Sequence, residues 1–131
     1  MCSRLAPICL ALAALVGPTL PAFADETACA GWSLPVALKG FLVEGVFPGP
    51  PEFASVPKGD AAYTAQFLYL SQPICVVADP VMGTPALSDV DMVQLACADT
   101  PLVPGQEVSV TGTLFAPHSG YHRAQVLLAC E

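Results

Sequence analysis

The sequence predicts a small all-β domain: a closed or partly open barrel of five to six strands, OB-like, with two disulfides. Three observations support this fold class. Hydrophobic residues fill 54% of the 131 positions and charged residues only 11%, which excludes a disordered chain and a charge-patterned helical bundle. Strand-like segments follow one another, with 14 prolines and 10 glycines in the chain to separate them. No helix is predicted to cover an open sheet, so barrel closure hides the edges, and a small β-sandwich is the second choice.

Residues 1–24 have the three parts of a secretory signal peptide. The cation Arg4 is followed by an apolar run and then by the cleavage pattern Ala22-Phe23-Ala24. The apolar run is too short for a transmembrane helix, and Pro7 interrupts it. We therefore predict a cleaved signal peptide at 1–24, a single domain at 25–131, a periplasmic or secreted location, and no stable membrane insertion after cleavage.

The first two predicted strands lie on either side of a proline-rich turn. Residues 36–47 are rich in valine, leucine and phenylalanine, and Gly40 stands among them where a bulge or a barrel bend favours glycine. Pro48-Gly49-Pro50-Pro51 ends this strand, and we expect the Asp60 side chain to brace the turn. Residues 61–70 form the second strand, because their aromatic and leucine side chains alternate between two faces.

Two further strands are predicted at residues 74–78 and 90–97. Pro80 ends the first of them, and Gly83 with Pro85 identifies the intervening segment as a loop. In the second, apolar residues alternate with other residues up to the final cysteine, as expected for a half-buried strand.

The clearest strand signal is a hairpin of residues 107–115 and 124–130. We predict a three-residue turn, Ser119-Gly120-Tyr121, because every facing pair on one side is then apolar. These facing pairs are Leu114–Val126, Gly112–Leu128 and Val110–Cys130. A two-residue turn would place polar residues opposite apolar ones.

Four cysteines remain beyond the signal peptide: Cys29, Cys75, Cys97 and Cys130. An even number in a small exported domain predicts two disulfides. Of the three possible connectivities, Cys75–Cys97 between neighbouring strands with Cys29–Cys130 between the chain ends is favoured. A zinc site is the rival interpretation, but no two of these cysteines have the close spacing of a zinc knuckle.

The charge of the chain limits its partners. Because Arg4 is the only charged residue in the signal peptide, its removal changes the formal net charge from −7 to −8. Phosphate binding depends on lysine and arginine, so nucleic acid is excluded as a partner. An acidic surface attracts cations, and we expect a cationic envelope or secreted protein as the partner.

The hairpin tip holds the candidate site residues. These are His118, Ser119, Gly120, Tyr121, His122 and Arg123. Tyrosine and arginine dominate the energetics of protein interfaces, which favours a contact loop. The two histidines, opposed across the predicted turn, also suit Zn or Cu, with a third ligand from Glu44, Asp60 or an aspartate between positions 79 and 99.

Several segments resemble an exported bacterial family known as domain of unknown function number forty-four thirty-one. The closing part carries most of the likeness, in Val108 to Phe115, His118-Ser119-Gly120 and Val126 to Leu128. Upstream motifs are Leu38-x-Gly40, Gly49-Pro-Pro51, Gly59-Asp60, Cys75-Val76 and Val93-Gln-Leu95. The resemblance implies an envelope or secreted location and no assigned activity. The family's hairpin is typically of the form His-x-Gly-His-His, whereas Tyr121 and Arg123 flank His122 here, which weakens an inherited metal role.

We therefore predict an exported, disulfide-stabilised binding or interaction module of the bacterial cell envelope, with no cofactor. The first alternative is an envelope protein that binds Zn or Cu through His118 and His122. The second is a hydrolase or a lysozyme-type inhibitor. An enzyme is the less favoured class, because the chain has no Gly-x-Ser-x-Gly elbow, His-Glu-x-x-His pair or phosphate-binding glycine loop.

Overall fold

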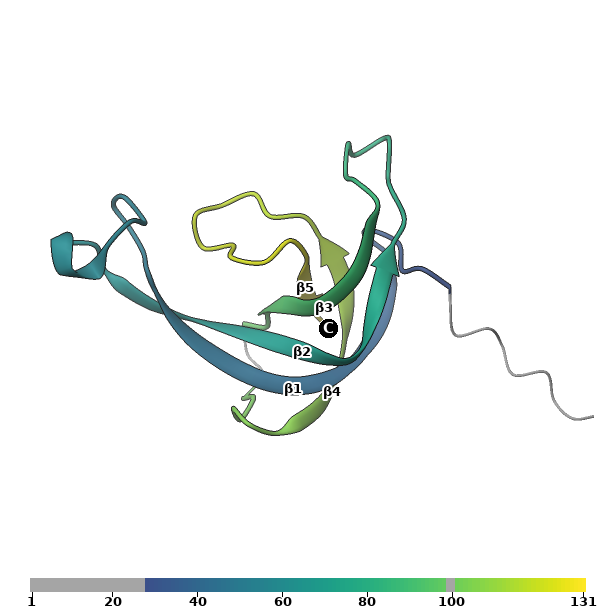
Figure 1. The fold of residues 1–131 in the computed structure, drawn as a ribbon, viewed down its shortest axis with the longest axis horizontal. Coiled ribbons are helices and arrows are strands. Elements are labelled where there is room, and N and C mark those ends of the chain that lie inside the picture. The colour runs from purple at the N-terminus through teal and green to yellow at the C-terminus, as the bar shows by residue number, and fades with distance from the viewer. Residues whose placement is uncertain (1–27, 99–100) are drawn as a thin grey trace, which may run out of the picture.

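The computed structural model describes residues 28–98 and 101–131, which fold into five β-strands (Figure 1). The strands are β1 (Pro35–Pro48), β2 (Ala62–Val76), β3 (Leu87–Ala96), β4 (Glu107–Phe115) and β5 (Leu127–Cys130). A single turn of 3-10 helix, η1 (Val56–Lys58), is the only helix in the described ranges. Within those ranges there is no helix of the length and apolarity that a membrane span requires. The predicted signal peptide at residues 1–24 lies outside the described residues.

The five strands form a closed ring in the order β1-β2-β3-β5-β4, and β4 pairs again with β1. All neighbouring strands are antiparallel except β3 and β5, which run parallel. This is the connectivity of an OB-like barrel, in which the last strand lies between the third and the fourth. The predicted fold class is confirmed, and the β-sandwich is not the fold.

The β1–β2 hairpin extends beyond the closed part of the barrel (Figure 1). β1 pairs with β2 from Gly40 to Pro48, but it pairs with β4 only from Pro35 to Phe41. The first half of β1 therefore belongs to the barrel wall. Its second half forms, with the start of β2, a projecting ribbon of two strands, which we call the β1–β2 ribbon (residues 43–48 and 62–67).

The strands predicted at residues 61–70 and 74–78 are one continuous strand, β2. The prediction of a break was wrong, because Pro73 produces an irregularity rather than an end. The register between β2 and β3 shifts between Tyr69 and Ile74. Proline lacks the N–H group that a regular ladder needs, and an irregular segment tolerates its absence.

The register of the β4–β5 hairpin also differs from the prediction. β4 matches the predicted range, but β5 begins at Leu127 rather than at Ala124. The observed pairs include Leu114–Leu128 and Gly112–Cys130. This is a shift of two residues, which keeps the same side chains on the inner face, so the apolar pattern alone does not distinguish the two registers. The connection is a long β4–β5 loop, residues 116–126, and the predicted three-residue turn is wrong.

The barrel interior holds the main hydrophobic core, to which every strand contributes. Its members with almost no exposed surface are Leu42, Leu68, Val76, Val93, Leu114, Val126 and Leu128. Trp32 packs with them, and its indole N–H donates to the carbonyl oxygen of Pro85 at 3.1 Å. At Gly40 a Cβ atom would overlap the carbonyl oxygen of Tyr69, so glycine at this position permits the close approach of β1 and β2.

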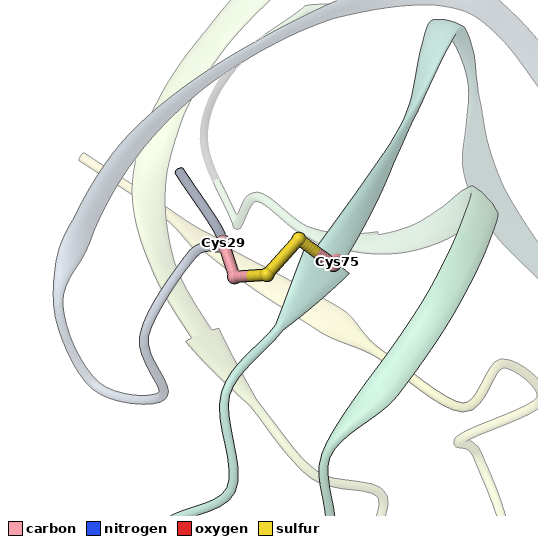
Figure 2. Close-up of a disulfide and its surroundings, with 2 residues drawn as sticks. All are labelled: Cys29 and Cys75. Atoms are coloured by element: carbon pink, nitrogen blue, oxygen red, sulfur yellow. A yellow bond between two sulfur atoms is a disulfide. The ribbon is translucent and has the colours of Figure 1, made fainter. Parts of the chain in front are cut away.

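The four cysteines form two disulfides, as predicted, but not in the favoured pairing. Cys29 is bonded to Cys75 (Figure 2) and Cys97 to Cys130, with Cα atoms 4.6 Å and 4.9 Å apart. The favoured pairs, Cys75–Cys97 and Cys29–Cys130, are therefore wrong. Two disulfides in a chain of this size fit an oxidising compartment.

The observed pairing follows from two parallel contacts that the sequence does not reveal. Ala96, the last residue of β3, lies opposite Ala129 of β5, and the residue that follows each of them is a cysteine. At the other site, Ala30 bridges Val76 in parallel, which places the preceding cysteine beside the end of β2 (Figure 2). Each cysteine is thus brought to its partner by backbone pairing one residue away.

Candidate functional site

The β4–β5 loop contains all six residues of the predicted contact site, and it packs against the outside of the barrel. After β4 the chain forms a long loop near β3 before it returns as β5 (Figure 1). Ala124 of this loop is 7% exposed and packs with Ala65 and Phe67 of β2 and with Met92 of β3. The loop is therefore anchored by a second, smaller hydrophobic cluster and is not a free hairpin tip.

Gln94 of β3 holds the loop in place through hydrogen bonds. Its side chain is buried, Nε2 donates to the carbonyl oxygen of Tyr121 at 2.8 Å, and Oε1 accepts from the backbone N–H of Arg123 at 2.6 Å. The backbone N–H of Gln94 also donates to the carbonyl oxygen of Val126 at 3.0 Å. One buried carboxamide thus satisfies loop backbone groups that would otherwise lack partners.

Arg123 joins the loop to the β1–β2 ribbon. Its Nε donates to the Tyr63 hydroxyl at 2.7 Å, and its Nη2 donates to the carbonyl oxygen of Pro48 at 2.7 Å. The guanidinium carbon lies 5.3 Å from the centre of the Phe47 ring and 5.7 Å from that of Tyr63. Arg123 is exposed, but two hydrogen bonds and two aromatic rings fix its position.

Tyr121 lies where the β4–β5 loop meets the β1–β2 loop (residues 49–61). Its ring centre is 5.0 Å from that of Phe53 and 4.9 Å from that of Tyr63, and both contacts are edge-to-face. At Gly120 a Cβ atom would lie only 2.9 Å from the Phe53 ring, so glycine permits this approach of the two loops. Tyr121 nevertheless remains 45% exposed. The two loops thus present a single joined surface, which we call the loop surface (Phe53, Gly120 and Tyr121).

Asp60 shapes the β1–β2 loop, as the sequence predicted. Its buried carboxylate accepts three backbone hydrogen bonds, from Glu52 at 2.9 Å and from Ala54 and Ser55 at 2.7 Å each. The N–H groups of Ser55, Glu52 and Ala54 lower the pKa of Asp60 below its usual value of 3.8, because they stabilise the ionised form. Gly59, with a φ of 115°, provides the left-handed turn that brings Asp60 back to these groups.

The two histidines lie together at the other side of the β4–β5 loop. Their ring centres are 4.6 Å apart, and Phe115 packs against both rings. The backbone N–H of His118 donates to Nδ1 of His122 at 2.9 Å, and the N–H of His122 donates to the Ser119 carbonyl oxygen at 3.1 Å. Burial, and to a lesser extent the neighbouring His118, lowers the pKa of His122 below its usual 6.5.

The histidine pair is close enough to share a metal ion, but the structure adds no further ligand. Among the described residues no group of three histidine, cysteine, aspartate or glutamate side chains could hold a metal. Glu44, Asp60 and the described aspartates Asp79, Asp89 and Asp91 are therefore not brought to His118 and His122 as a third ligand. Asp99, the last aspartate in the predicted range, lies outside the described residues. One imidazole nitrogen, Nδ1 of His122, is already occupied by a hydrogen bond.

A groove of about 420 Å³ runs beside Tyr121 along β2 and β3. Its lining includes the carboxylate of Glu44, the carboxamides of Gln66 and Gln94, and the ring of Tyr63. Nε2 of Gln66 donates to Oε1 of Glu44 at 2.9 Å. No lysine, arginine or histidine lines this groove, so its one charged group is a carboxylate.

Sequence reasoning found the residues of the β4–β5 loop but not those that position them. The sequence pattern places Gln94, Phe47 and Tyr63 in strands and does not indicate that they contact this loop. The available signal was Gln94 itself, a carboxamide between Val93 and Leu95 that is buried with them. A buried polar side chain requires partners, and here those partners are the loop backbone.

The comparison with known families concerns this same part of the chain. Residues 92–130 match the model of a family described as Domain of unknown function (DUF4431). The match runs from β3 through the β4–β5 loop to β5, so the predicted resemblance is confirmed there. Of the upstream motifs, the match includes Val93-Gln-Leu95, but it does not extend to those before residue 92. No curated protein and no solved structure matches the chain.

Proposed function

We propose that the protein is an exported binding module of the bacterial cell envelope that recognises a cationic protein through the loop surface. The observation that carries this proposal is Tyr121, which is fixed by Phe53 and Tyr63 and still 45% exposed. A rigid, half-exposed aromatic side chain loses little conformational freedom on binding. Tyrosine is also among the residues that contribute most to interface affinity.

The charge distribution supports a cationic partner. The chain has a formal net charge of −7 with only four lysines and arginines. Within the described residues, Lys39 pairs with Glu107 at 3.1 Å, and Arg123 is bonded to the ribbon. The groove beside Tyr121 offers Glu44 to a basic side chain. A lysine or arginine that enters this groove would meet a carboxylate and two tyrosine rings.

The location is supported by the predicted signal peptide at residues 1–24 and by the two disulfides. Both are typical of proteins that fold outside the cytoplasm. A partner in the envelope or in the surrounding medium is therefore expected. Lysozyme is a suitable cationic probe of that kind.

The experiment measures binding of the purified protein to lysozyme by biolayer interferometry at low and physiological salt. The control ligand is lysozyme whose lysines have been succinylated, which removes its positive charge. We expect binding to the cationic form only, with an affinity that falls as salt rises. Equal binding to both forms, or to neither, would contradict the proposal.

Two tyrosine variants locate the surface. Tyr121→Ala should weaken binding by about tenfold or more if this residue is a central contact. Tyr69→Ala is the matched control, because Tyr69 is 48% exposed and belongs to β2, away from the loop surface. An equal loss of affinity in the two variants would count against the loop surface.

A further inference from the structure

The second half of β1 has an edge without a strand partner in the described part of the chain. β1 pairs with β4 only as far as Phe41. Leu42 adds two bonds: its N–H donates to the carbonyl oxygen of Gln106 at 2.9 Å, and its carbonyl oxygen accepts from Gly105 at 2.7 Å. From Val43 to Phe47 the strand pairs with β2 alone.

The alternation of a β-strand identifies the groups that face this open edge. The backbone groups of Leu42 point away from β2, so those of Glu44 and Val46 point the same way. Pro48 continues the series, because its carbonyl oxygen accepts from Arg123 and not from β2. The N–H and C=O groups of Glu44 and Val46 therefore face outward, and no backbone partner for them lies among the described residues.

The side chains along this edge leave it accessible. Val46 is 70% exposed and Val43 is 41% exposed. Proteins commonly block an open edge with lysine, proline or a bulge. Between residues 43 and 47 there is no lysine or proline, and the pairing with β2 is regular.

We propose that this edge of β1, residues 43–47, binds an extended segment of the cationic partner as an additional strand. Four backbone hydrogen bonds at Glu44 and Val46 would hold the segment. Glu44 would select a lysine or arginine opposite it, and Val43 and Val46 would contact apolar side chains on the two faces. The inference rests on the proposed function for the charge of the partner, but it concerns a different surface.

Charge favours such a segment over a second copy of the chain. Antiparallel pairing of two copies about Gly45 would bring together two molecules that each carry a net charge of −7. A basic segment meets the opposite sign of charge, and Glu44 is the one ionised side chain between residues 43 and 47. If the protein instead forms a dimer through β1, that result contradicts this proposal.

The test uses a fluorescent synthetic peptide of about nine residues that alternates lysine and valine, the length of an ordinary strand. In the control peptide glutamate replaces each lysine. Val46→Pro removes one outward N–H and no bond to β2, and proline is tolerated on strand edges. Val46→Ala is the matched variant, since it shortens the side chain and keeps the N–H. Affinity is measured by anisotropy, and the site is located by amide NMR shifts and hydrogen exchange.

We expect the lysine peptide to bind more tightly than the glutamate peptide and to slow hydrogen exchange at the amides of Glu44 and Val46. Val46→Pro should weaken binding by about tenfold, and Val46→Ala by less than about threefold. Glu44→Gln should reduce the preference for the lysine peptide. Equal affinity of Val46→Pro and Val46→Ala, or no binding of either peptide, would overturn the proposal, as would a β1-mediated dimer in the absence of peptide.

A second measurement does not depend on the folding of Val46→Pro. Two N-methylated forms of the lysine peptide are tested against the unchanged protein. In one form the odd-numbered residues carry the N-methyl groups, and in the other form the even-numbered residues do. Methylation of the residues whose N–H groups face β1 should abolish binding, whereas methylation of the residues between them should preserve it. Equal binding of both peptides would overturn the proposal.

The two proposals can fail separately. If Val46→Pro loses peptide binding and Tyr121→Ala does not, the result supports peptide binding at the β1 edge, even if the protein does not bind lysozyme. If only Tyr121→Ala loses peptide binding, the proposal for the β1 edge is overturned, and the loop surface is the peptide-binding site instead.

Discussion

Arg123 and Tyr63 meet side chain to side chain, with Nε of the arginine donating to the phenolic oxygen at 2.7 Å. The same hydroxyl donates to the carbonyl oxygen of Tyr121 at 3.2 Å. One hydroxyl therefore connects the β1–β2 ribbon to two residues of the β4–β5 loop. The position of the loop surface depends on this connection.

Tyr63→Phe removes the hydroxyl and keeps the ring. We expect the free energy of unfolding to fall by about 1 kcal/mol, because two partly exposed hydrogen bonds are lost while the packing is kept. Urea unfolding followed by circular dichroism measures the change. Tyr69→Phe is the control, since it deletes the hydroxyl of an exposed tyrosine on the same strand. Identical losses in the two variants would show that the hydroxyl of Tyr63 has no special role.

Gln94→Leu leaves the carbonyl oxygen of Tyr121 and the N–H of Arg123 without their buried partner. We expect a loss of about 2 kcal/mol in unfolding free energy and faster hydrogen exchange in the β4–β5 loop. Gln66→Leu is the matched substitution on β2, where the carboxamide bonds only to the exposed Glu44, and it should cost less than about 0.5 kcal/mol. A cost for Gln94→Leu no larger than that for Gln66→Leu would contradict this role.

Asp60 should contribute to stability in a pH-dependent way. Its pKa in the folded protein lies below 3.8, so ionised Asp60 favours folding. The contribution is present above about pH 4 and is lost as pH falls through the lowered pKa. In Asp60→Asn the stability should be lower at neutral pH, and the difference from the natural protein should shrink on acidification. Unfolding midpoints measured across this range test the prediction, and a difference that is independent of pH would refute it.

His122 predicts a second pH dependence, nearer neutrality. Because its folded pKa lies below 6.5, protonation favours the unfolded chain. Its contribution is complete above about pH 6.5 and is lost as pH falls from there through the folded pKa. Protonation of Nδ1 would also break the bond from the His118 N–H. His122→Asn keeps an acceptor near this position and cannot titrate, so its stability should vary less with pH in this window. An unchanged pH profile would contradict the assignment.

Metal addition tests the alternative function. A ligand at about a hundredfold its dissociation constant stabilises by about 2.7 kcal/mol, which raises the Tm of a domain of this size by about 10 °C. With two imidazoles and no third ligand among the described residues, we expect Zn or Cu to raise it by less than about 2 °C. A large shift that the His118→Ala/His122→Ala variant abolishes would establish the metal site instead.

Much of the fold follows from patterns within single strands. β4 spans the predicted residues, and the alternation of β2 correctly separates Phe67 from Leu68. Gly40 stands where the backbone of Tyr69 on the neighbouring strand leaves no room for a side chain. These features depend on local periodicity and on backbone sterics, which a single sequence records.

The features that escaped prediction depend on which strands become neighbours. The disulfide pairing depends on β5 lying parallel to β3, and the path of the β4–β5 loop depends on Gln94 of a different strand. The apolar pattern fits both hairpin registers, since they differ by two residues. Contacts such as Arg123 with Tyr63 join residues far apart in sequence and leave no periodic signal.

The strand that closes the ring is the last of the five to be synthesised. β1, β2 and β3 can associate as soon as they are made, but β5 joins β3 to β4 only once residues 127–130 are available. Until then β3 and β4 each have an unpaired edge, and Cys97 remains a thiol because its partner Cys130 has not yet been made. A nascent chain is therefore most vulnerable to aggregation and to wrong disulfides just before completion.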